Sequence, residues 1–151
     1  MVIAIGCDHA GVELKALIHG LLKSEGIEVR DVGTSGKESV DYPDYGSKAA
    51  EAVSKGQVDG AVLICGSGIG MSIVANKYKN VRAALCHDVF TAKMSREHNN
   101  ANVLVMGSRI ITEEAAAEIL KVWLHTKFEG GRHELRLKKI SKIEDSIEFK
   151  T

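Results

Sequence analysis

The sequence has few of the features that cross-link small secreted proteins or anchor proteins in membranes. It contains three cysteines in 151 residues, Cys7, Cys65 and Cys86. This odd, sparse number argues against a disulfide framework and fits a reducing compartment. No apolar run is long enough to span a bilayer, and the first residues lack the charged start and the cleavage pattern of a signal peptide. We therefore expect a cytoplasmic protein with no membrane partner.

The sequence also lacks an excess of charge of either sign. Its 20 basic and 20 acidic residues give a formal net charge of +0. General binders of nucleic acids or membrane surfaces usually carry a basic excess, so we expect no nucleic-acid partner. No repeat, low-complexity tract or linker divides the chain, and 44% of its residues are hydrophobic. The sequence therefore predicts a single domain over residues 1–151, with a sizeable core.

Strand and helix patterns alternate along the whole chain. Short apolar runs predict five strands, and apolar residues at helical spacing predict the helices between them. This alternation favours a parallel sheet with helices on both faces, a three-layer, Rossmann-like α/β/α fold. We expect the long, charged last helix to pack on a partner subunit. The expected strands are 2–7, 28–32, 60–65, 81–86 and 103–107; the expected helices are about 11–24, 45–55, 70–78, 89–98, 113–127 and 132–149, and Pro43 lies in an expected loop at 33–45.

A glycine-rich turn follows the third expected strand. Residues 65–70, Cys-Gly-Ser-Gly-Ile-Gly, join the apolar run 61–64 to a helix. Such a turn presents backbone N–H groups at the positive end of a helix, where anions bind. The glycines run G-x-G-x-G, unlike the G-x-G-x-x-G of dinucleotide-binding folds, and no P-loop Gly-Lys-Ser/Thr follows. A nucleotide-binding module nevertheless stays open as an alternative.

Cys65 stands at the last position of that strand, beside the N–H donors of the turn. Donors at a helix terminus favour the thiolate form of a nearby cysteine. A thiolate can act as a general base, and we expect that role for Cys65. For Cys7 and Cys86 we favour the other interpretation, a small buried apolar side chain.

The carboxyl ends of parallel strands meet at one edge of a sheet, where ligands bind. We expect Cys65, Asp8, His9 and Arg109 to gather there. Asp8 and His9 suit either the start of a helix or contacts with a ligand. A zinc hydrolase is a third possibility, although no C-x-x-C or H-x-x-x-H spacing fixes a pair of ligands. The side chains of zinc-ligand type expected near this edge are Cys7, His9, Cys65, Cys86 and His87.

Two further pairs of residues are expected away from this edge. His98 and Asn99 end the helix before the fifth strand, so they would have to reach back or serve a neighbouring subunit. Arg132 and Arg136 are four residues apart on one face of the last helix. Two guanidinium groups side by side match a phosphate, whereas the lysines that follow favour a solvated basic face.

Six motifs together resemble those of one enzyme family. These motifs follow one another along nearly the whole chain, as they do in the B-type ribose-5-phosphate isomerases, which the sequence resembles. That family groups with the galactose-6-phosphate and allose-6-phosphate isomerases. Any one of the motifs would be weak evidence, but six in order are specific. The motifs are residues 6–11 (GCDHAG), 41–43 (DYP), 65–70 (CGSGIG), 95–99 (SREHN), 107–109 (GSR) and 128–133 (FEGGRH).

The resemblance implies the interconversion of ribose 5-phosphate and ribulose 5-phosphate through an enediolate, in the non-oxidative branch of the pentose phosphate pathway, with no metal and no organic cofactor. It makes Cys65 the base that moves a proton between C1 and C2, with help from Ser67. It makes His98 the acid that opens the sugar ring, and the N–H groups of residues 66–70 the anion hole. It assigns substrate binding to Asp8, His9, Tyr42, Gly66, Ser67, Gly68, Ile69, Gly70, Asn99, Arg109, Arg132 and Arg136, with the phosphate held chiefly by arginine.

The resemblance also implies a homodimer, in some members a tetramer, with each site at the subunit interface. Some relatives use a glutamate of the following helix as the base, but residues 70–78 contain no acid, so the cysteine branch fits. Ser67 stands where some relatives have threonine, which implies a small change in the pocket. The galactose-6-phosphate enzymes lack the cysteine, which favours ribose; a six-carbon sugar phosphate stays an alternative substrate.

Overall fold

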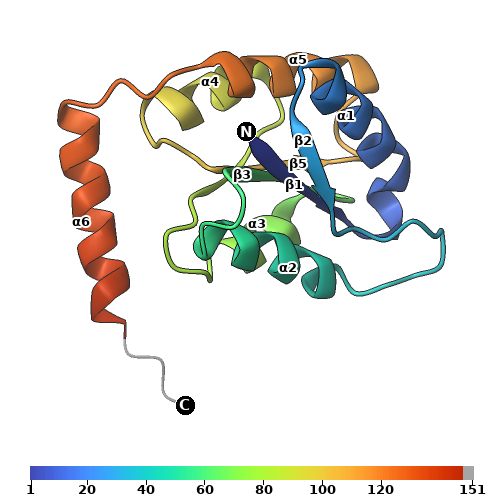
Figure 1. The fold of residues 1–151 in the computed structure, drawn as a ribbon, viewed down its shortest axis with the longest axis horizontal. Helices are drawn as coiled ribbons and strands as arrows, with labels where there is room; N and C mark the ends of the chain where they lie inside the picture. The colour runs from blue at the N-terminus through green and yellow to red at the C-terminus, as the bar shows by residue number, and fades with distance from the viewer. Residues whose placement is uncertain (148–151) are drawn as a thin grey trace.

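Strands and helices alternate in the structure, a computed structural model that describes residues 1–147. The fold predicted from the sequence, one α/β domain built on five parallel strands, is confirmed (Figure 1). The strands are β1 (Val2–Cys7), β2 (Glu28–Asp31), β3 (Gly60–Cys65), β4 (Ala83–Leu85) and β5 (Val103–Gly107). The helices are α1 (Val12–Ser24), α2 (Tyr42–Ser54), α3 (Ile69–Ala75), α4 (Val89–Glu97), α5 (Glu113–His125) and α6 (Arg132–Ser146), with a 3₁₀ turn, η1, at His9–Gly11.

The strands lie in the order β2-β1-β3-β5-β4, and all neighbours run parallel. The three central strands are almost wholly buried, because helices cover both of their faces. From β1 the chain moves to β2 on one side and, later, to β3 on the other. The strand order therefore reverses between β1 and β3, which opens a crevice at their carboxyl ends.

Helices form a layer on each face of the sheet (Figure 1). On one face, α1, α4 and α5 bury side chains such as Ile18, Ala92 and Leu120 against β1, β3 and β5. On the other face, α2 and α3 pack small or flexible residues, including Ala49 and Met71, in a second core. Small alanines let α2 approach this face of the sheet closely.

Some element boundaries differ from those predicted. The helix α2 begins at Tyr42 rather than residue 45, because Pro43 lies in its first turn, where its missing N–H costs no hydrogen bond. The strand β4 covers only Ala83–Leu85 instead of residues 81–86, since it pairs on one side only. The helix α6 ends at Ser146, and its expected end at residue 149 lies outside the described residues.

The last helix stands beside the α/β body rather than on it (Figure 1). Gly130 and Gly131 precede it with φ values of 68° and 57°, which residues with a Cβ rarely adopt. At its far end, the Glu144 carboxylate accepts hydrogen bonds from the N–H of Asn80 (3.1 and 3.0 Å). Its apolar side chains Leu135 and Ile143 are exposed, so α6 has an apolar face that this chain leaves uncovered.

No helix within residues 1–147 is both long enough and apolar enough to cross a membrane.

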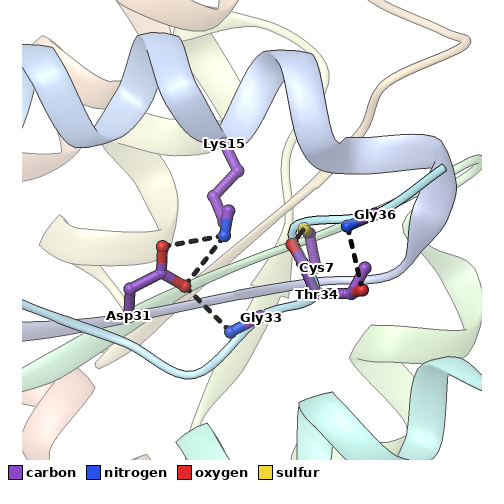
Figure 2. A network of polar contacts seen from close by, with 6 residues as sticks. All are labelled: Cys7, Lys15, Asp31, Gly33, Thr34 and Gly36. Carbon is purple, nitrogen blue, oxygen red and sulfur yellow. Dashed lines mark hydrogen bonds and ion pairs between the residues drawn. The ribbon is translucent and has the colours of Figure 1, made fainter.

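A polar network fixes the loop that follows β2 (Figure 2). The buried ammonium of Lys15 donates to both carboxylate oxygens of Asp31 (3.0 and 2.7 Å), and Oδ1 of Asp31 also accepts the N–H of Gly33 (2.9 Å). The Cys7 thiol donates to the carbonyl of Thr34 (3.5 Å). A Cβ on Gly33 would lie 2.8 Å from the Cys7 nitrogen, so this close approach requires glycine. The network holds the loop against the end of β1.

Loss of the Asp31 carboxylate should destabilise the fold. In Asp31→Ala the Lys15 ammonium stays buried without its partner, and we expect a loss of about 1–3 kcal/mol in the free energy of unfolding, less than for a fully buried pair because Asp31 is partly exposed. Chemical denaturation measures this loss. The matched control is Glu51→Ala, which removes an exposed ion pair with Lys55 and should change little. Equal losses in the two variants would contradict the structural role of the network.

Candidate active site

A shallow cavity of about 560 Å³ lies at the carboxyl edge of the sheet, beside the point where the strand order reverses. Three strand ends and the start of α2 contribute to it. Most of the residues predicted for the turn and this edge are thereby brought together. Those that line the cavity are Asp8, Tyr42, Cys65, Gly66, Ser67, Ile69, Gly70 and Arg109, and the sequence analysis did not foresee Ile73 and Ile110 beside them.

Backbone hydrogen bonds hold the glycine turn in place. The carbonyl of Cys65 accepts the N–H of Ser108 (2.9 Å), and the carbonyl of Gly66 accepts the N–H of Arg109 (3.0 Å). The Ser67 hydroxyl accepts the N–H of Ile69 (3.2 Å), so this donor of the expected anion hole is already paired. The turn is thus preorganised before any ligand binds.

Gly68 lies against Leu85 and does not line the cavity. Its φ is +80°, and an added Cβ would lie 2.4 Å from Cδ1 of Leu85. Both the left-handed backbone and the contact with Leu85 therefore require glycine here. A direct contact of Gly68 with substrate remains a prediction.

The three thiols lie in different surroundings. Cys65 is 5% exposed and borders the cavity. Cys7 and Cys86 lie in the core, as the sequence predicted. Burial raises the pKa of Cys7 to about 11, and burial likewise raises the pKa of Cys86. Both core thiols therefore stay protonated at neutral pH, and Cys65 is the thiol in contact with the cavity.

Two glycines of the turn make room for polar side chains at the rim. A Cβ on Gly70 would lie 2.5 Å from Cζ of Tyr42, and one on Gly66 would lie 3.3 Å from Nη1 of Arg109. The phenol ring and the guanidinium group therefore lie directly against the turn. A hydroxyl donor and a fixed positive charge flank Cys65, which suits an anionic, hydroxyl-rich ligand.

Asp8 and His9 serve the local structure as well as the site. Oδ1 of Asp8 accepts the N–H of Ala10 (3.0 Å) and caps η1, while the residue also lines the cavity. Nδ1 of His9 accepts the N–H of Val40 (3.1 Å), so a neutral imidazole carries its proton on Nε2. His9 itself is not among the residues that line the cavity.

The remaining predicted residues form a second group near the start of α6. His98 caps α4, and its ring stacks on that of His133 with the centroids 4.1 Å apart and the planes 13° from parallel. Arg132 begins α6, and Arg136 lies one turn later. Within one chain, His98, Asn99 and these arginines do not line the cavity that holds Cys65. The sequence alone indicates no role for His133, since its burial depends on how α6 meets α4.

Within residues 1–147, the side chains that could hold a metal ion are those of His98, Glu129 and His133, whose ligand atoms lie within 4.8 Å of one another. This group differs from the zinc ligands considered at the strand ends, where His9 and Cys7 make hydrogen bonds to the loop. The lone pair of an imidazole lies in the plane of its ring. Because the two rings are stacked and almost parallel, their lone pairs do not converge on one ion as zinc coordination requires.

Comparisons with known proteins identify the family of the chain. The ribose/galactose isomerase family matches residues 3–140. Ribose-5-phosphate isomerase B of Escherichia coli is 49% identical over 142 residues, which is 94% of this chain and 95% of that protein. D-erythrulose-4-phosphate isomerase of Pectobacterium atrosepticum is 42% identical over 144 residues, 94% of each chain.

The solved structure of ribose-5-phosphate isomerase B from Clostridium thermocellum superposes with a TM-score of 0.94, at 51% identity over 96% of this chain and 98% of that one. A likeness of this extent covers the whole fold and not only the motifs. The protein is an isomerase. It belongs to the ribose/galactose isomerase family.

Alkylation should distinguish the three cysteines. At pH 8 we expect iodoacetamide to modify Cys65 first, because the two core thiols are inaccessible and their raised pKa leaves little thiolate at this pH. Peptide mass spectrometry of the native protein gives the sites, and the denatured protein, in which all three should react, is the control. Equal labelling of Cys7 or Cys86 in the folded protein would contradict the placement of the thiols.

Proposed function

We propose that this protein is a B-type ribose-5-phosphate isomerase, which interconverts ribose 5-phosphate and ribulose 5-phosphate in the non-oxidative branch of the pentose phosphate pathway. The observation that carries this proposal is the Cys65 thiol at a cavity formed by a preorganised glycine turn. An aldose–ketose isomerisation needs one base and a means to stabilise an oxyanion. The turn and its thiol can supply both in one place.

In the proposed reaction, the Cys65 thiolate takes the proton from C2 of the open-chain aldose. The electrons of the C–H bond form the C1–C2 double bond, and the carbonyl oxygen at C1 becomes the enediolate oxygen. The thiol then returns the proton to C1, while a proton passes from O2 to O1, and the ketose results. The backbone donors of residues 66–70 that are not already paired, as the N–H of Ile69 is with the Ser67 hydroxyl, would stabilise the anion together with that hydroxyl, with about 3–4 kcal/mol from each well-placed donor.

The other proposed roles belong to residues around the cavity and to the second group. His98 would open the furanose ring, and Asn99 would bind the sugar. Asp8, His9 and Tyr42 would contact its hydroxyl groups. Arg109, Arg132 and Arg136 would bind the phosphate, and binding at this remote dianion can orient the reacting carbons.

We further propose that two copies of the chain complete each site. The cavity and the group around His98 lie apart within one chain, which supports a partner that supplies the second group. Two uncovered apolar surfaces also support it. Ile69 and Ile110 are exposed at the rim of the cavity, Leu135 and Ile143 are exposed on α6, and a groove of about 680 Å³ lies between α6 and the edge strand β4. We propose a homodimer, with a tetramer as the larger alternative.

A six-carbon sugar phosphate, such as allose 6-phosphate or galactose 6-phosphate, is the alternative substrate. The relative named for erythrulose 4-phosphate makes a four-carbon substrate worth including in the same assay. The specific observation in favour of ribose 5-phosphate is the higher identity to relatives named for it. A nucleotide-binding module is less well supported, because α3 is only seven residues long and follows the third strand.

Cys65→Ala should abolish most of the activity. Without the base we expect kcat for ribose 5-phosphate to fall about 10²–10⁴-fold, with a smaller change in KM. The same steady-state assay, run on the wild type with ribose 5-phosphate, allose 6-phosphate, galactose 6-phosphate and erythrulose 4-phosphate, identifies the substrate. Cys86→Ala, another buried cysteine outside the cavity, is the matched control and should turn over normally. Turnover by Cys65→Ala near that of the wild type would refute Cys65 as the base.

Subunit mixing tests the shared site. Cys65→Ala and His98→Ala should each be almost inactive, but their mixed dimers contain one intact site, because Cys65 and His98 would come from different chains. After unfolding and refolding an equimolar mixture, random pairing predicts about one quarter of wild-type activity. Each variant refolded alone is the control. No gain on mixing, with dimers present by light scattering, would mean that each site lies within one chain.

A further inference from the structure

His133 is the one buried side chain of α6 within residues 1–147. Its ring covers one face of the His98 imidazole. A phenylalanine or leucine could fill the same space without a buried polar atom. The position of His133 beside the proposed ring-opening acid therefore suggests a role beyond packing.

The backbone on which His98 stands is already fixed. The N–H of His98 donates to the carbonyl of Met94 (2.9 Å). The Arg82 guanidinium donates to the carbonyls of Asn99 and Asn100, at 3.1 Å each, and Arg96 donates to the carbonyl of Ala101 (2.6 Å). These bonds leave rotation of the side chain as the main freedom of His98.

The same connection that carries His133 is tied to the end of α4. The N–H of Glu129 donates to the carbonyl of Glu97 (3.1 Å), and the N–H of His133 donates to that of Gly130 (3.1 Å). Nε2 of His133 lies 3.3 Å from Oε2 of Glu129, but this buried atom has no hydrogen-bond partner. A buried polar atom without a hydrogen bond lowers stability, so packing alone does not account for a histidine at this position.

We propose that His133 is a positioning residue that holds the imidazole of His98 by stacking. With one face of the ring covered and the backbone fixed, the plane of the His98 imidazole keeps a constant orientation. A small displacement of a catalytic group can cost much of its effect. This inference rests on the proposed ring-opening role of His98.

Three single variants test the stack. In His133→Ala the face of His98 is uncovered, and we expect kcat for ribose 5-phosphate to fall about ten- to hundredfold while KM changes less than about twofold. His133→Phe keeps a flat ring at the same place and should recover kcat to within about threefold. His125→Ala, an exposed histidine on α5, is the matched control and should behave as the wild type.

A second pair of variants separates positioning from general stability. If His133 acts through His98, His133→Ala should lower the activity of a His98→Ala protein no further than about twofold, since the two effects are not additive. Thermal unfolding identifies any variant that fails to fold. If His133→Ala does not fold, the kcat of His133→Phe decides the test. Wild-type kcat in His133→Ala, low kcat in a folded His133→Phe, or full additivity with His98→Ala would overturn the inference. If the wild-type protein does not isomerise ribose 5-phosphate, the proposed function fails instead.

Discussion

The pairing between β3 and β5, which continues beyond the ends of both strands, is the interaction on which the site depends. The ladder aligns Cys65 with Gly107, and the N–H groups of Ser108 and Arg109 then bind the carbonyls of Cys65 and Gly66. A Cβ on Gly107 would lie 2.6 Å from the backbone of Ser67, so the two segments touch. The buried parallel sheet therefore holds the turn in a fixed shape, and this shape determines which ligand the turn can bind.

The position of Cys65 in the fold, and not its residue type, gives its thiol access to the cavity. Cys7 ends β1 as Cys65 ends β3 and both are buried, yet the Cys7 thiol bonds to a loop carbonyl and does not line the cavity. Cys65 borders the cavity, whereas the loop after β2 closes over Cys7, so that a Cβ on Gly33 would lie 3.2 Å from its sulfur, and the Cys7 thiol bonds to Thr34 (Figure 2). Two cysteines at equivalent strand ends can thus differ in their access to the cavity.

Much of the fold and part of the site followed from sequence alone. The apolar runs of β1, β3 and β5 predicted a buried parallel sheet, and the spacing of the glycines located the cavity, because both patterns reflect local geometry. The start of α2 at Tyr42 does not follow from the sequence, since Pro43 suits a loop as well as the first turn of a helix. The stack of His98 on His133 could not be foreseen from the sequence. It brings together the end of α4 and the start of α6, and the direction of α6 depends on the backbone of Gly130 and Gly131.

The placement of α6 beside the body has a consequence for when the protein becomes active. If the partner completes each site as proposed, a single folded chain carries a formed cavity and a fixed thiol, but its own His98 lies too far away to open the sugar at that cavity. Catalytic competence would then appear only upon encounter of two chains, and it would vary with protein concentration near the dissociation constant of the dimer. In chains that have not yet assembled, Cys65 would not act on a sugar phosphate.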